Sequence, residues 1–310
     1  MLFPGQGSQS VGMLRELGET DPPITATWSE ASDVLGYDMA ELVASDPEGL
    51  LDQTEYTQPA LVAAGVAVWR TWKARGGADP AMLAGHSLGE YTALVAADAL
   101  DFADALRLTR VRGQAMQAAV QPDAGAMAAI IGLDDDAVGE VCTSVSSGDD
   151  HLVSAANFNA PGQVVVAGHA DAVTAACERA KEAGARMAKM LAVSVPSHCA
   201  LMRPAAERLS AHLSEIPLRE PRIPLLHNVD AHPRASVEGI RKALVAQLES
   251  PVHWTDSVRA MIAEGHGLML ECGPGRVLTG LNKRIDRQLQ TIALKDADGM
   301  HAALVATAAV

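Results

Sequence analysis

Short apolar runs alternate along this chain with longer segments in which apolar residues recur every three or four positions. The short runs predict strands at 81–84, 224–227, 268–271 and 291–294. The longer segments predict helices at 59–73, 90–96, 101–119, 201–214, 236–249, 256–264 and 276–284. In the helix at 59–73, Leu61, Gly65, Val68 and Trp72 share one face, and Gly76-Gly77 ends it. Strands that alternate with helices favour an α/β fold with a parallel sheet.

The segment from about 125 to 191 has a different order of predicted strands and helices. It predicts strands at 126–131, 152–156, 164–167 and 186–190, and helices at 134–145 and 170–183. The order strand, helix, strand, strand, helix, strand is the ferredoxin-like pattern. We therefore expect a large α/β-hydrolase-like domain (1–122 and 194–310) that is interrupted by a small ferredoxin-like subdomain (123–193). A cleft between the two is a natural substrate site.

Composition narrows the class of protein. The chain has 310 residues, and because 48% are apolar and only 3% aromatic, its core must consist mainly of Ala, Val and Leu. No apolar run of about 18 residues is free of charge, and no secretory signal is visible, so we expect no membrane span and a cytoplasmic protein. The net charge of −14 argues against nucleic-acid binding.

The sequence gives little support for a metal site or for disulfide bonds. The cysteines Cys142, Cys177, Cys199 and Cys272 form no C-x-x-C pair, and reduced thiols are the simplest interpretation. No cluster of His, Cys and carboxylates has metal-ligand spacing. The start of the chain is unusual, because only Met1–Phe3 precede the loop Pro4–Gln9. We expect a first strand that is shortened, with a native N-terminus that is longer.

The strongest chemical signal is Gly85-His86-Ser87-Leu88-Gly89, which has the form G-x-S-x-G of a nucleophile elbow. The sharp turn from strand to helix needs small flanking residues. Ser87 would lie at the N-terminus of the helix at 90–96, where backbone N–H groups stabilise negative charge. The alternative is a chance match in a chain that is rich in Gly and Ala.

A serine nucleophile needs a base, and His198 is the best candidate. It follows Ser194-Val195-Pro196-Ser197, where the chain re-enters the large domain. The alternative is a loop or capping histidine. His86 should point away from the serine beside it, and His212 should lie on the surface of a helix. No acid stands in the usual order between serine and base, so either Asp230 or a backbone carbonyl would orient the ring.

Two further residues are candidates for substrate contact. Gln6 lies in Gly5-Gln6-Gly7 at a strand end, where an oxyanion site or an ordinary turn would fit. The run Gly5–Ser10 falls short of G-x-G-x-x-G and lacks the later acid, which excludes dinucleotide binding. Arg112 is bracketed by Leu108 and Met116 on one helical row, so it either snorkels to the surface or pairs with an anion.

The ordered set of motifs resembles the malonyl-CoA–acyl carrier protein transacylase family over almost the whole chain. The motifs are Phe3–Gln9, Thr57–Ala60, Gly85–Tyr91, Arg112-Gly113, Asn157–Asn159, Pro161–Gln163, Ser194–His198, Asn228-Val229 and Gly273–Gly275. The resemblance implies transfer of a malonyl group from malonyl-CoA to acyl carrier protein for fatty-acid synthesis. It implies ping-pong kinetics through a malonyl-serine, no bound cofactor and a monomeric protein.

The resemblance also implies roles for individual residues. Ser87 would be the acylated nucleophile and His198 its base, and the two side chains should lie within hydrogen-bonding reach. Gln6 and the backbone N–H of Leu88 would form the oxyanion hole. Arg112 would face the space before Ser87 and bind the malonyl carboxylate, and the backbone carbonyl of Gln247 would orient the histidine. The Leu88 side chain fits malonyl selectivity, since relatives selective for methylmalonyl often carry glutamine there.

The docking surface and two alternative functions stay open at this stage. The acidic carrier protein needs local positive charge, which Lys283 and Arg284 with Arg287 would offer, or a second stretch at Lys181, Arg186 and Lys189. A solvated charge run explains each stretch equally well. A serine esterase or thioesterase would share the elbow but would need no carboxylate clamp. An inactive docking module would keep the fold, although the presence of both Ser87 and His198 argues against it.

Overall fold

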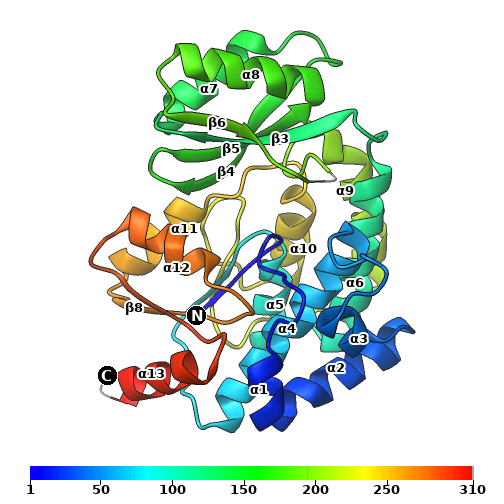
Figure 1. The fold of residues 1–310 in the computed structure, drawn as a ribbon, viewed down its shortest axis with the longest axis vertical. Helices are drawn as coiled ribbons and strands as arrows, with labels where there is room; N and C mark the ends of the chain where they lie inside the picture. The colour runs from blue at the N-terminus through cyan, green and yellow to red at the C-terminus, as the bar shows by residue number, and fades with distance from the viewer. Residues whose placement is uncertain (194, 309–310) are drawn as a thin grey trace.

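The computed structural model describes residues 1–193 and 195–308. Its strands form two separate sheets, one above the other in Figure 1. The lower sheet contains, in spatial order, β7 (Leu225–Leu226), β2 (Leu83–Gly85), β1 (Leu2–Phe3), β8 (Leu268–Glu271) and β9 (Gln290–Ala293). Its neighbouring strands are parallel. This is the mixed α/β architecture with a parallel sheet that the alternation predicts.

Helices cover both faces of the parallel sheet, because both faces are apolar. Leu2 belongs to the core with α11 and α12, and the next residue, Phe3, belongs to the larger core with α4, α5 and α6. The helices outside the upper sheet are α1 (Arg15–Thr20), α2 (Pro22–Leu35), α3 (Met39–Ala44), α4 (Thr54–Ala74), α5 (Gly89–Ala96), α6 (Phe102–Ala118), α9 (Arg203–Glu215), α10 (Val237–Ala246), α11 (Trp254–Ala263), α12 (Val277–Ile285) and α13 (Ala297–Ala308), with a 3-10 turn at Ala200–Met202.

The upper sheet is antiparallel. Its spatial order is β4 (Val153–Ala160), β5 (Gln163–His169), β3 (Gly125–Ile131) and β6 (Met187–Met190). The helices α7 (Asp135–Val145) and α8 (Ala170–Glu182) pack on one face through a core that includes Ile130. The other face, which carries Met127 and Val165, is turned toward the lower unit. Period-two alternation along β3 thus separates a helix-covered face from a cleft-facing one.

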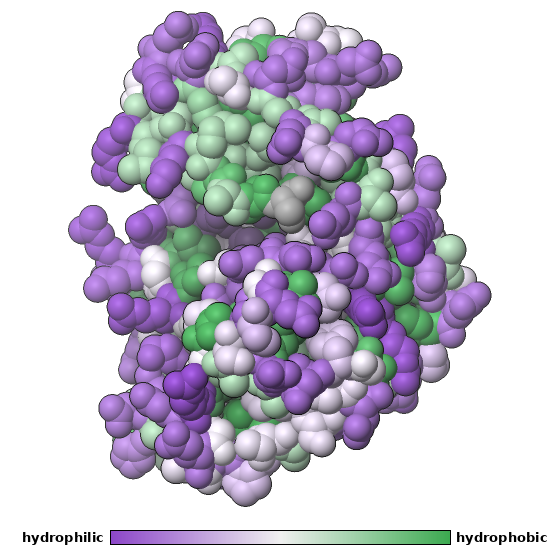
Figure 2. Space-filling view, turned by 45° about the vertical axis from the view of Figure 1, so that its right-hand side comes forward, coloured by the Kyte–Doolittle hydropathy of each residue, from purple (hydrophilic) through white to green (hydrophobic). Residues whose placement is uncertain are grey.

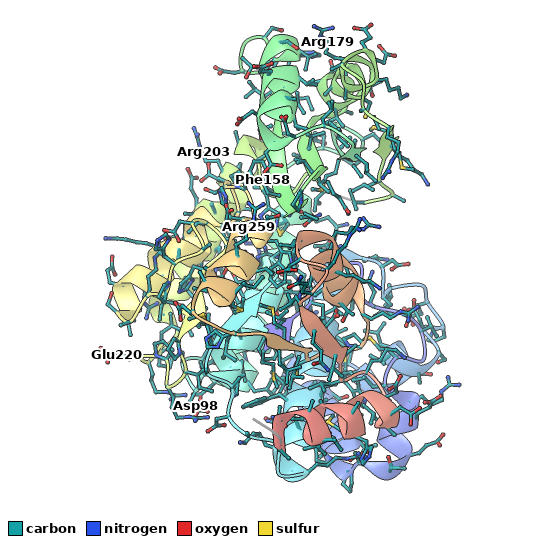
Figure 3. All side chains as sticks on the ribbon, turned by 90° about the vertical axis from the view of Figure 1, so that its left-hand side faces the viewer. Asp98, Phe158, Arg179, Arg203, Glu220 and Arg259 are labelled. Carbon is teal, nitrogen blue, oxygen red and sulfur yellow. The ribbon has the colours of Figure 1, made fainter. Side chains whose placement is uncertain are left out.

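The two sheets are joined at the end of β4. The backbone N–H of Phe158 donates to Val252 O at 2.9 Å, and Phe158 O accepts from Thr255 Oγ1 at 3.0 Å. Figure 3 shows Phe158 at this junction, above the helix α11 that carries Arg259. These two hydrogen bonds hold the upper sheet over the lower one and so fix the position of one relative to the other.

Several element boundaries differ from the sequence expectation. The helix expected at 59–73 begins at Thr54, with Pro59 inside it. The hydroxyl of buried Thr57 donates to Leu51 O and Gln53 O, which holds the turn before the proline in helical form. The helices α1, α2, α3 and α13 were not expected, and Ser194, at the expected boundary, lies outside the described residues. No helix among the described residues has the length and apolar character needed to cross a membrane.

Candidate active site

A cleft of about 540 Å³ opens between the upper sheet and the C-terminal ends of the parallel strands. Figure 2 shows the surface hollowed between the upper and lower parts of the molecule. Gln6, Ser87, Leu88, Arg112 and His198 all line this cleft. Gln6, Ser87 and Leu88 follow the carboxyl ends of the parallel strands β1 and β2, where ligands bind in α/β proteins. Within residues 1–193 and 195–308, no group of His, Cys and carboxylates could hold a metal ion.

Ser87 lies on a strained turn between β2 and α5. Its φ angle is 50°, in the left-handed region that non-glycine residues seldom adopt. Glycine is needed on both sides, since a Cβ on Gly85 would lie 2.0 Å from Gly89 C and one on Gly89 would lie 2.1 Å from Phe3 O. The backbone N–H of Ser87 donates to Asn228 Oδ1 at 2.6 Å. The turn therefore has the geometry of a nucleophile elbow, braced by an asparagine.

His198 is the hydrogen-bond partner of this serine. Ser87 Oγ and His198 Nε2 are 2.7 Å apart, so the expected contact is present. His198 Nδ1 lies 2.7 Å from the backbone carbonyl of Gln247, which fixes the tautomer with the proton on Nδ1 and a free lone pair on Nε2. No carboxylate among the described residues bonds to this ring. Asp230, one of the two expected orienting groups, pairs instead with Arg234 near the surface.

The surroundings of His198 keep its ring uncharged. Burial and the neighbouring positive charge of Arg112 lower the pKa of His198 to about 3. A neutral imidazole at neutral pH is the form that can accept the serine proton. The site therefore holds an uncharged imidazole that can accept a proton without first losing one to solvent.

This lowered pKa predicts a pH dependence of stability. We expect the free energy of unfolding to fall as the pH drops from 6.5 toward 3, because His198 takes up a proton in the unfolded chain but not in the folded one. The ring should contribute a slope of about 1.4 kcal/mol per pH unit in that window. Urea denaturation across the window should give a smaller slope for His198→Gln than for the unmodified chain, and equal slopes would contradict the lowered pKa.

Arg112 is buried beside Ser87 rather than snorkelling to the surface. The residue is 1% exposed, and its Nη2 lies 3.4 Å from Ser87 Oγ. Its guanidinium donates to Gln58 Oε1 at 2.8 Å and to Gln247 Oε1 at 3.0 Å. Its Nε has no partner, and none of the ion pairs among the described residues includes it. A buried cation with neutral partners and spare donors suits a ligand carboxylate.

The two expected oxyanion donors also border the cleft. Gln6 follows β1, and its Nε2 lies 3.4 Å from Thr54 Oγ1. The backbone N–H of Leu88 has no acceptor among the described residues, whereas the N–H of Ser87 is occupied by Asn228. Leu88 also precedes the first turn of α5, where the helix dipole is positive. The free N–H is therefore available to a developing oxyanion.

The remaining candidate residues are placed as follows. His86 turns away from Ser87, with Nε2 2.7 Å from Asn159 Oδ1, and His212 lies on the exposed side of α9. Lys283 and Arg284 are exposed in the last turn of α12, a helix whose Val277 lines the cleft. Arg284 donates to the side chain of Gln163.

Sequence reasoning assigned no role to three residues that hold this site together. Gln58 contacts Arg112, Asn228 braces the turn of Ser87, and buried Glu90 bonds to Gln247. Gln247 itself uses its side chain as well as the expected backbone carbonyl. One local signal was available for Glu90, since it is the only charged residue in the otherwise apolar stretch 90–96.

Comparison with known proteins places the chain in a family. The model of the acyl transferase domain matches residues 1–307. The malonyl CoA-acyl carrier protein transacylase of Escherichia coli K12 is 51% identical over 98% of this chain and 97% of its own. The structure of the enzyme of that name from Coxiella burnetii is 45% identical, with a TM-score of 0.97 over 98% of this chain and 96% of that one.

A further solved structure contains a malonyl-transacylase in complex with its type II PKS acyl-carrier protein. That transacylase is 51% identical to this chain, with a TM-score of 0.96 over 99% of this chain and 98% of its own. The buried arginine beside a serine–histidine pair thus occurs in a chain whose relatives are acyltransferases. The chain belongs to the acyl transferase family and, within it, to the malonyl CoA-acyl carrier protein transacylases.

Proposed function

We propose that this enzyme transfers the malonyl group of malonyl-CoA to the phosphopantetheine thiol of acyl carrier protein, through a malonyl-Ser87 intermediate. One observation carries the choice of acyl group. The guanidinium of Arg112 is buried 3.4 Å from Ser87 Oγ and has no carboxylate partner among the described residues. An acyl group that ends in a carboxylate supplies that partner, and acetyl does not. The named activity of the relatives supports the same substrate pair.

The first half-reaction uses the neutral His198. Its Nε2 takes the proton of Ser87 Oγ while the oxygen attacks the thioester carbonyl. Gln6 and the backbone N–H of Leu88 stabilise the oxyanion that forms. When the C–S bond breaks, His198 returns the proton to the thiolate of coenzyme A, which leaves as the thiol. The malonyl group remains as an ester on Ser87, its carboxylate paired with Arg112.

The second half-reaction reverses the roles of the same groups. The phosphopantetheine thiol gives its proton to His198 and attacks the malonyl ester, and the proton returns to Ser87 Oγ as the C–O bond breaks. The kinetics are therefore ping-pong. Arg112 holds the malonyl group in place between the two half-reactions, and no cofactor takes part.

Finer features of the fold and partners belong to the same proposal. We assign 1–122 and 194–310 to an α/β-hydrolase-like catalytic domain and 123–193 to a ferredoxin-like subdomain. The antiparallel order β4-β5-β3-β6 supports the latter class. Lys283 and Arg284, near the cleft on α12, are proposed to dock the acidic carrier protein. The enzyme is proposed to act in the cytoplasm as a monomer.

Intact-mass spectrometry tests the proposed transfer directly. The chain mixed with malonyl-CoA should gain one malonyl group, and holo acyl carrier protein added next should remove it and gain the same mass. Release of the adduct as free malonate, without label on the carrier protein, would indicate a hydrolase instead. No adduct at all would contradict the proposal.

A further inference from the structure

A buried carboxylate close to the nucleophile takes no part in the two half-reactions. Glu90 lies in the first turn of α5 and has no exposed surface. It accepts hydrogen bonds from His227 Nδ1 at 2.5 Å, from the backbone N–H of Asn228 at 3.1 Å and from Gln247 Nε2 at 2.8 Å. A carboxylate buried so completely needs these hydrogen-bond donors. One of the donors, Gln247, also contacts Arg112 and His198.

Glu90 is one of three groups that favour a single orientation of the Gln247 amide. A carboxylate only accepts hydrogen bonds, so the amide must present Nε2 to Glu90, and Nε2 also donates to Ser87 O at 3.1 Å. Oε1 then faces the other way and accepts from Arg112 Nη2 at 3.0 Å. The reverse orientation would set two donors against each other at Arg112. Of the three contacts, the one to Glu90 is the shortest and the only one made by a carboxylate.

Gln247 contacts both His198 and Arg112. Its backbone carbonyl accepts from His198 Nδ1, and its side chain accepts from Arg112. We propose that Glu90 is a positioning residue that fixes Gln247 and thereby places Arg112 for the malonyl carboxylate in register with His198. This inference rests on the proposed function, because its test measures how well Arg112 selects the malonyl group. It assigns to Glu90 no contact with substrate.

Two substitutions separate the geometry of Glu90 from its charge. Glu90→Asp keeps the charge but withdraws the carboxylate by one C–C bond, about 1.5 Å, from Gln247. Glu90→Gln keeps the reach, because its oxygen can accept from Asn228 and Gln247. Its NH2 group can donate to His227 if the ring moves its proton to Nε2, which has no partner in the structure. The two variants therefore give opposite expectations.

The measured quantity is the ratio of kcat/KM for malonyl transfer to kcat/KM for acetyl transfer. We expect Glu90→Asp to lower this ratio about tenfold or more, since Arg112 loses its fixed acceptor. Glu90→Gln should hold the ratio within about threefold, which is below the roughly fivefold effect of a typical lost hydrogen bond. An unchanged ratio in Glu90→Asp would overturn the inference. An equal loss in Glu90→Gln would also overturn it, because charge and not geometry would then be responsible.

Glu271 offers a matched control. It is likewise unexposed and accepts from Thr279 Oγ1 and from the backbone N–H groups of Leu278 and Thr279, with no contact to Gln247. Glu271→Asp should lower the thermal midpoint and leave the ratio unchanged; a ratio that falls as in Glu90→Asp would show a general structural effect and overturn the inference. The unmodified chain is assayed for its malonyl adduct alongside. If it forms none, the proposed function fails, whereas a normal adduct with an unchanged Glu90→Asp ratio defeats only the role of Glu90.

Discussion

Replacing Ser87 with alanine is expected to abolish the malonyl adduct and to lower malonyl transfer by about 10⁴-fold or more. The variant removes the hydroxyl oxygen that lies 2.7 Å from His198 Nε2, so the proposed covalent intermediate cannot form. Intact-mass spectrometry with malonyl-CoA reports the adduct, and a carrier-protein assay reports the transfer. The Ser87 hydroxyl is small and the turn around it is held by Asn228, so the fold should persist.

The double variant tests whether the serine and the histidine act as one unit. His198→Ala should also lose most of the activity, and adding it to Ser87→Ala should cause little further loss, because groups that act in one step are not additive. A malonyl adduct that persists on Ser87→Ala would place the nucleophile elsewhere. Losses that multiply in the double variant would contradict a shared proton transfer.

Replacing Arg112 with alanine is expected to lower malonyl transfer about 10²- to 10³-fold, with a much smaller effect on acetyl transfer. The malonyl carboxylate would enter a buried site without its cationic partner, and removing one partner of a buried pair costs about 3–5 kcal/mol. Acetyl carries no such charge. Arg112→Lys should restore little of the malonyl activity, because an ammonium group lacks the planar set of donors that binds Gln58, Gln247 and a carboxylate together.

Arg107 provides the control for this substitution. It lies on the same helix α6, but it is solvent-exposed and pairs with Asp104. Arg107→Ala should leave both transfer rates within about twofold, since exposed ion pairs contribute little. Equal losses of malonyl and acetyl transfer in Arg112→Ala would show that the arginine supports the fold of the site and does not select the acyl group.

The sequence predicts the elements of this fold wherever their apolar pattern is strong. The strand at 268–271 is found as expected, and the helix at 101–119 differs by one residue at each end. The helices α1 and α3 escaped prediction because each has only six residues, too few to show a period. The helix α2 was missed although Ile24, Trp28, Ala31 and Leu35 form an apolar stripe along it. The last helix, α13, is so rich in alanine that its periodicity is faint.

Part of the active site could likewise be predicted from a local motif, whereas its contacts between distant residues could not. Ser87 sits in a contiguous motif, and its strained turn follows from the glycines on either side. The link from Glu90 to Gln247 spans 157 residues, and that from Arg112 to Gln247 spans 135. No local pattern of polar residues encodes such pairings, because Glu90, Arg112 and Gln247 lie on, or at the end of, three different helices that meet only in the folded chain. The resemblance to a family supplied Gln247, and only the three-dimensional arrangement revealed its second contact.

The placement of β1 has a consequence for how the chain acquires its fold. This strand comes first in the sequence but lies in the middle of the parallel sheet, where Leu2 pairs with Ala84 on one side and with Glu271 on the other. During synthesis the second pairing must wait until most of the chain has left the ribosome. Nascent chains that stop before β8 would expose one edge of their central strand, so they should be poor at folding and prone to associate. The central strand can therefore gain its second neighbour only after β8 has emerged.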